Sequence, residues 1–181
     1  MDKASSSQST KYSLLQQEKS NLVLDLINLP SDQHIEKLSQ FLTDIVQASI
    51  SGAADFVTLE NVKIFLQYVR QNAQLTLSEI LVALQTLEIL LQKSKEKGRT
   101  IVNTDNLGTA LVCVCGLVLK FLRDQPYKNS WWSNAFSMDI HTLAESELVI
   151  LEVMDWQIWI NEKNFIRFAQ RVVQGDKLFK S

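Results

Sequence analysis

The sequence predicts an all-α protein, a five-helix bundle around a central apolar helix, with further helices flanking it on the N-terminal side. Three observations support this class. Among 181 residues there are only 5 Gly and 2 Pro, too few for the tight turns that hairpins and sheets require. Apolar residues recur at three- and four-residue steps through most of the chain, and one segment is apolar on every face. A helix without a polar face has neighbours on all sides, so we expect it at the centre.

The length indicates one domain, because two ordinary domains need more residues. Residues 1–12 are polar and rich in Ser, and we expect them to form a disordered tail. Residues 13–30 carry enough Leu, Val and Ile for an N-terminal helical segment that ends before Pro30. The single domain is then expected over residues 31–175, and residues 176–181 form a C-terminal tail.

Side chains that favour the N-cap position precede each of five apolar stripes with helical spacing. These residues are Ser31, Thr58, Thr76, Asp139 and Asn161. Thr76 and Glu79 also have the spacing of a capping box. The helices that follow the first three caps are expected to end near Ser51, Asn72 and Ser94.

The central helix is expected from about Thr104, and it ends before Pro126. It contains the only cysteines, Cys113 and Cys115, which lie about 200° apart around a helix and can neither bridge each other nor share a metal. We expect buried free thiols in a reducing compartment. The aromatic segment at 127–136, YKNSWWSNAF, is expected to form one short helical turn.

Charge and hydropathy exclude several classes of partner. The net charge is -2 and the pI is about 5.7, so the chain offers no positive field to nucleic acid or to anionic lipid. The longest apolar run, residues 107–119, is far shorter than the roughly 20 residues that span a bilayer. We therefore expect a soluble protein of the cytoplasm, the nucleus or both, with neither nucleic acid nor membrane as a partner.

The sequence gives no sign of catalysis. Its two histidines, His34 and His141, lie in separate segments, so the usual ligands of a transition metal are missing. No phosphate loop, dinucleotide fingerprint, nucleophile elbow or zincin motif occurs. We expect no catalytic residue, no cofactor and no metal, with a small helical enzyme of another type as the competing interpretation.

Two charged residues lie in unusually apolar settings. Lys120 follows the apolar run of the central helix, and Glu147 falls between Leu143 and Ile150 on an apolar stripe. A charge in such a place must be paired, hydrogen-bonded or reserved for a partner, because burying it alone is costly. The competing interpretation is that Lys120 reaches solvent from the helix edge and that Glu147 lies on a solvated flank.

Four stretches occur in an order that resembles a cyclin box: LTLSEILVALQTLEILLQ, the apolar helix ending LVLKFLRD, PYKNSWW, and LAESELVILEVMDWQIWINEKNFIRF. The resemblance covers about residues 35–172. It is closest to the single-box phosphate-regulating (P-type) and Y-type cyclins, whose third box helix typically ends in K-F-x-D-D, followed by Y-x-N-x-x-W. The corresponding residues are Lys120, Phe121, Asp124, Tyr127, Asn129 and Trp132. A Leu-Asp-Trp-like turn falls at residues 154–156.

The resemblance implies a non-catalytic subunit that binds and activates a cyclin-dependent protein kinase. It assigns polar contacts with the kinase to Lys120 and Glu147, and it adds Phe121, Asp124 and Tyr127 to the partner-binding residues.

An internal Arg–Asp brace of the family falls on Lys63 and Glu88, which could still pair. One alternative is a cyclin-fold scaffold that binds a protein partner without activating a kinase. Another, a cyclin-like repeat that binds DNA, is disfavoured by the acidic pI.

Overall fold

The computed structural model describes residues 25–174, and its regular elements over that range are all helical. The α-helices are α2 (Asp32–Ser49), α3 (Leu59–Tyr68), α4 (Leu77–Glu96), α5 (Leu107–Leu122), α6 (Asn129–Phe136), α7 (Ile140–Val153) and α8 (Glu162–Gln174). A 3-10 turn (Ala53–Asp55) follows α2, and a π-helical turn (Val69–Ala73) follows α3. The expected all-α class is confirmed.

The expected tails at 1–12 and 176–181 lie outside the described residues, as does most of the expected helical segment at 13–30. The part of that segment that the structure describes is helical over residues 25–27 and ends before Pro30, as predicted. Within the described range no helix has both the length and the apolar character that crossing a bilayer requires.

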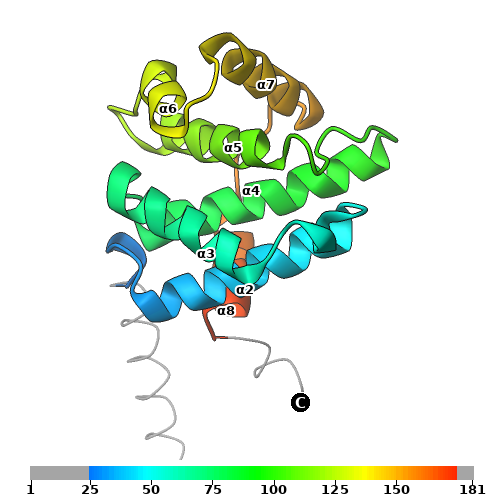
Figure 1. The fold of residues 1–181 in the computed structure, drawn as a ribbon. Coiled ribbons are helices and arrows are strands. Elements are labelled where there is room, and N and C mark those ends of the chain that lie inside the picture. Colours follow the sequence, from blue (N-terminus) through cyan, green and yellow to red (C-terminus); the bar gives the residue numbers. More distant parts are fainter. Residues whose placement is uncertain (1–24, 175–181) are drawn as a thin grey trace, which may run out of the picture.

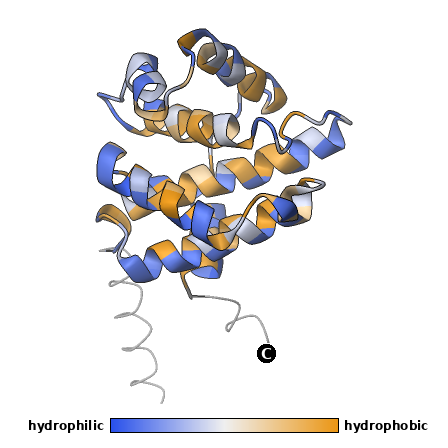
Figure 2. Cartoon of the chain, viewed as in Figure 1, coloured by the Kyte–Doolittle hydropathy of each residue, from blue (hydrophilic) through white to orange (hydrophobic). Residues whose placement is uncertain are grey.

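The two long helices α4 and α5 lie side by side in the middle of the bundle (Figure 1). Helices α2 and α8 pack against α4, α3 packs against α2, and α6 and α7 pack against α5. Apolar residues follow both central helices along their length (Figure 2). Val114 and Val118 of α5 are buried, so the apolar segment is central, as its lack of a polar face predicted.

All five predicted N-caps are confirmed, because each side chain accepts a hydrogen bond from a backbone N–H in the first turn of its helix. Ser31 and Thr76 form reciprocal capping boxes. Thr76 Oγ1 accepts from Glu79 N at 3.3 Å, and Thr76 N donates to Glu79 Oε2 at 2.8 Å. The other three caps are Thr58, Asp139 and Asn161.

Helix α5 starts at Leu107, three residues later than the expected position near Thr104. The delay has a local cause, because Asn103 and Asn106 bond each other's backbone. Asn103 N donates to Asn106 Oδ1 at 2.9 Å, and Asn106 N donates to Asn103 Oδ1 at 3.1 Å. Such side-chain bonds to nearby backbone compete with the helix.

The aromatic segment forms a complete eight-residue helix, α6, where the sequence predicted one turn. Packing explains the extra length. The ring of Phe136 lies 5.1 Å from Tyr68 and 6.1 Å from Phe65, centroid to centroid, and Tyr68 Oη donates to Ala135 O at 2.8 Å. These contacts with α3 stabilise a helix that would be marginal alone.

Candidate functional site

Three helices converge on the carboxylate of Glu147 in α7. Lys120, in the last turn of α5, donates from Nζ to Glu147 Oε1 at 2.6 Å and to Oε2 at 2.8 Å. Asn129, the first residue of α6, donates from Nδ2 to Glu147 Oε2 at 2.8 Å. Glu147 is only 8% exposed, so the interpretation of a solvated flank is wrong. Its charge is compensated inside the domain.

Lys120 itself reaches solvent, since its side chain is 33% exposed. A lysine ammonium group has three N–H donors, and two of them go to Glu147. The third can therefore serve an acceptor on a partner. The cation also lies at the C-terminal end of α5, where the helix dipole favours positive charge.

A glycine one turn earlier in α5 makes room for this arrangement. A Cβ atom on Gly116 would lie 3.4 Å from Trp132 Nε1 and 3.6 Å from Glu147 Oε1. Without that atom, both side chains pack closely against the helix. Trp132 is 1% exposed, and its Nε1 has no hydrogen-bond partner among the described residues.

Gly116→Ala is expected to keep or raise stability, whereas Gly116→Leu is expected to lower it. The alanine methyl would make contacts of ordinary length, and alanine is favoured over glycine within a helix by about 0.5–1 kcal/mol. A leucine must displace Trp132 or Glu147, which costs about 1–3 kcal/mol. Urea unfolding of both variants measures the difference. A leucine variant as stable as the alanine variant would show that this space is not confined.

Arg123 fixes the end of α5 to the start of α4. Its Nε donates to Glu79 Oε1 at 2.6 Å, and its Nη2 donates to Glu79 Oε2 at 2.7 Å and to Gln74 O at 3.0 Å. Burial tends to raise the pKa of Glu79, but the hydrogen bonds from Arg123 and Thr76 outweigh it and hold that pKa below its ordinary value. This pair holds in place the helix end that carries Lys120.

The other residues predicted to bind a partner differ in their exposure to solvent. Phe121 is exposed, and its ring lies edge-on to Trp159, 6.2 Å between centroids. Asp124 is also exposed. Tyr127 is half-buried and stacks on Trp131 at 4.2 Å, so it contributes to internal packing.

Lys120 and Phe121 are consecutive at the C-terminal end of α5, and Trp159 lies against Phe121. We name these three exposed groups, together with the buried Glu147 that pairs with Lys120, the α5–α7 face. Trp159 is 74% exposed, and Phe121 beside it presents a second large apolar ring. Exposed aromatic residues next to a polar group are typical of protein-binding surfaces. The sequence pattern did not single out Trp159, because a tryptophan after a helix gives no sign of whether it is buried.

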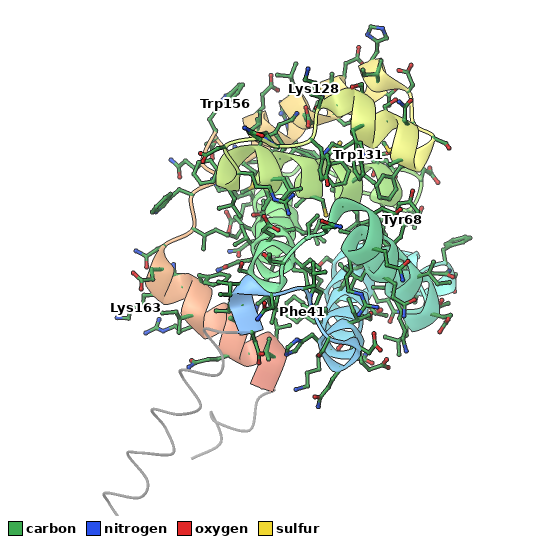
Figure 3. All side chains as sticks on the ribbon, turned by 90° about the vertical axis from the view of Figure 1, so that its left-hand side faces the viewer. Phe41, Tyr68, Lys128, Trp131, Trp156 and Lys163 are labelled. Carbon is green, nitrogen blue, oxygen red and sulfur yellow. The ribbon has the colours of Figure 1, made fainter. Side chains whose placement is uncertain are left out.

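The turn after α7 is held by Lys93 of α4 and by Lys97, the residue that follows α4. Lys93 Nζ donates to Asp155 Oδ2 at 2.8 Å and to Met154 O at 3.2 Å. Lys97 Nζ donates to Asp155 Oδ1 and to Val153 O. Asp155 and Trp156 have φ values of 53° and 60°, left-handed conformations that non-glycine residues rarely adopt. Trp156 consequently lies at the surface (Figure 3).

Hydrogen bonds and charge from Lys93 and Lys97 lower the pKa of Asp155 from 3.8 to about 2. A carboxylate with a lowered pKa in the folded state stabilises the fold above its ordinary pKa, and this stabilisation is lost as the pH falls towards the folded value. Asp155→Asn is therefore expected to flatten the pH dependence of unfolding free energy between about pH 4 and pH 2. Denaturant titrations across that range measure the slope. Asp124→Asn is the control, and an equal slope for wild type and Asp155→Asn would contradict the assignment.

The expected pair between Lys63 and Glu88 is wrong. Lys63 Nζ bonds Glu36 Oε2 of α2 at 2.6 Å. Glu88 accepts two hydrogen bonds from Arg171 of α8, at 2.9 and 2.7 Å. The reason is which helices pack together. Helix α3 packs on α2, which places Lys63 next to Glu36, whereas α8 packs on α4 and places Arg171 next to Glu88.

The two cysteines are buried and free, as predicted. Burial raises the pKa of both Cys113 and Cys115 to about 12, so neither forms a thiolate near neutral pH. Over residues 25–174, no three His, Cys, Asp or Glu side chains are grouped so that they could hold a metal ion.

No protein-family model, curated protein or solved structure matches the chain. Over residues 25–174 the protein is an all-helical domain, with the Lys120–Glu147 ion pair at the C-terminal end of α5 and the exposed rings of Phe121 and Trp159 in contact with each other.

Proposed function

We propose that the chain is a cyclin-like regulatory subunit that binds and activates a cyclin-dependent Ser/Thr protein kinase. One observation carries the proposal. Lys120 and Glu147, the two residues to which the resemblance assigns kinase contacts, meet at 2.6 Å on the α5–α7 face, and Lys120 is one-third exposed. The order of motifs that resembles a single P-type or Y-type cyclin box supports the same function.

In this proposal the chain shifts the kinase from its inactive towards its active conformation and catalyses no reaction itself. A free kinase of this class holds its regulatory C-helix outward, so that the Lys–Glu ion pair that positions ATP is not formed. A surface that binds only the inward state stabilises that state by its differential affinity. Such a surface must be rigid, and the Arg123–Glu79 and Asn129–Glu147 bonds supply that rigidity.

The α5–α7 face offers a kinase helix two kinds of contact. The third N–H of Lys120 can donate to a backbone carbonyl or a carboxylate. Phe121 and Trp159 can bury apolar side chains of the partner, and buried aromatic residues often dominate binding energy. The polar contact would fix the orientation of the complex, and the apolar contact would supply most of its affinity.

A scaffold function is the second candidate, because the charges of Lys120 and Glu147 already compensate each other within the domain. The ion pair then needs no kinase residue to compensate either charge. A cyclin-fold scaffold would bind a protein partner on this surface and leave kinase activity unchanged.

Affinity capture from native extract tests the proposal. We expect the wild-type chain to retain a cyclin-dependent kinase, identified by mass spectrometry and active on a Ser/Thr substrate. The double variant Lys120→Met/Glu147→Gln should lose the kinase, because it removes the cation without leaving a buried charge. Lys163→Ala is the matched control, since Lys163 lies on α8 (Figure 3). Capture of only non-kinase partners would contradict the proposal.

A further inference from the structure

Helices α2 and α4 form a trough that α8 covers only in part. Phe168 of α8 packs edge-on against Phe41 of α2, with 5.2 Å between ring centroids, and Lys37 Nζ bonds Val173 O. These contacts cover α2 as far as Phe41. Beyond them lies a cavity of about 550 Å³ between the second halves of α2 and α4 and the segment that follows α4. Its apolar lining includes Ile45, Leu91 and Val102.

The charged residues that line this cavity are Glu88, Lys95 and Arg99. Glu88 is already neutralised, because Arg171 bonds both of its carboxylate oxygens. Lys95 and Arg99 form no ion pair with any carboxylate of the described residues. The cavity therefore has two uncompensated positive charges over an apolar floor, in a chain whose net charge is -2.

Arg99 is held at the edge of the cavity by its backbone. Ser94 Oγ donates to Arg99 O and accepts from Ile101 N at 3.3 Å, and Arg99 N donates to Ser94 O at 2.9 Å. The segment that carries this cation is thus attached to the end of α4. The Arg99 side chain is exposed, and these bonds hold its backbone in place.

A second hollow, of about 290 Å³, continues from the first along the same side of α4. It shares Glu88 with the cavity, begins at Gln85 and includes Arg167 of α8. Lys95 lies ten positions after Gln85 in α4, which is about 15 Å along a helix. That length suits an extended peptide of about four or five residues better than a single small anion. We name the two hollows together the α4 groove.

We propose that the α4 groove binds an acidic peptide segment of a partner protein. In this arrangement an apolar side chain of the peptide lies on Ile45 and Leu91. Its carboxylates reach Lys95 and Arg99 at one end and Arg167 at the other. The groove is a second surface, distinct from the α5–α7 face. The C-terminal ends of α2 and α4 lie at one edge of the bundle and the C-terminal end of α5 lies at the opposite edge (Figure 1).

The positive charge of the α4 groove favours a segment of a partner protein over either terminal segment of this chain as its ligand. Residues 1–24 contain three Lys against two acidic residues, and residues 175–181 contain two Lys against one Asp. Neither segment therefore has an excess of acidic side chains to complement a cationic groove. An acidic segment from another protein does.

The test is a binding titration with a fluorescein-labelled octapeptide of alternating Glu and Leu, followed by anisotropy and by ¹H–¹⁵N spectra of the full chain. We expect saturable binding and shifted amide signals within residues 45–49, 85–95, 99–102 and 164–171. Lys95→Glu/Arg99→Glu should weaken binding by about tenfold or more, because two attractions become repulsions. Lys128→Glu is the matched control, since Lys128 lies before α6, outside the groove (Figure 3).

Four outcomes would overturn the proposal. The first is the absence of saturable binding, and the second is an equal loss in the Lys128→Glu control, which would indicate general electrostatic attraction. The third is equal binding of a peptide with Gln in place of Glu. The fourth is full competition by inorganic phosphate at the peptide's own concentration, which would indicate a simple anion site. None of these readouts requires a kinase, so they are independent of the function proposed for the α5–α7 face.

Discussion

Trp132→Ala is expected to lower the free energy of unfolding by about 3–5 kcal/mol, the typical cost of truncating a fully buried aromatic side chain. Trp132 is 1% exposed and lies between Trp131, 5.0 Å away, and Phe136, 5.9 Å away, centroid to centroid. Its removal would leave a cavity between α5 and α6 and loosen the residues that hold Glu147. Equilibrium unfolding in urea measures the change.

Two further variants make this prediction specific. Trp159→Ala removes the same type of side chain from a site that is 74% exposed, and we expect a change within about 0.5 kcal/mol. Trp132→Phe keeps an aromatic ring and removes the unpaired Nε1 donor, so it should cost less than the alanine variant. Equal effects of Trp132→Ala and Trp159→Ala would contradict the role of Trp132 in the packing between α5 and α6.

The second large effect is expected at Lys120 and Glu147, in kinase binding. Lys120→Ala alone would leave the buried carboxylate of Glu147 with only Asn129 as a donor among its described partners. That loss should also reduce the stability of the domain by about 2 kcal/mol, less than for a fully buried pair because Lys120 is partly exposed. The single substitution Lys120→Ala is therefore expected to change both the stability of the domain and its kinase binding.

The double variant Lys120→Met/Glu147→Gln separates the two effects. It leaves no buried charge, and glutamine can still accept the hydrogen bond from Asn129. We expect a melting temperature close to that of wild type and a loss of about 2–5 kcal/mol in kinase binding, or about thirtyfold and more in affinity. A reduced melting temperature with unchanged affinity would instead show that the pair only braces the domain.

Local features of the fold could be predicted from the sequence because their causes are local. The caps at Ser31 and Thr76 depend on residues three positions apart, and the central place of α5 follows from its apolar faces alone. The length of α6 could not be predicted from its local sequence. It depends on contacts between Phe136 and α3, which are distant in sequence.

The candidate site was predictable only in part, for the same reason. The apolar settings of Lys120 and Glu147 marked them as charges that need a partner, and in the structure they are partners of each other. The choice between Glu36 and Glu88 as the partner of Lys63 depends on packing order, which no local pattern encodes. Arg123 and Glu79 are 44 positions apart, and neither has a setting that marks it as unusual.

The most direct test of the central claim is a titration of the captured kinase, freed of its native regulatory subunits, with the purified chain. We expect Ser/Thr kinase activity to rise to a plateau with the wild-type chain. The Lys120→Met/Glu147→Gln variant should reach the same plateau only at concentrations about thirtyfold higher or more. Saturable binding of the wild-type chain with no rise in kinase activity would contradict activation and leave the scaffold function in its place.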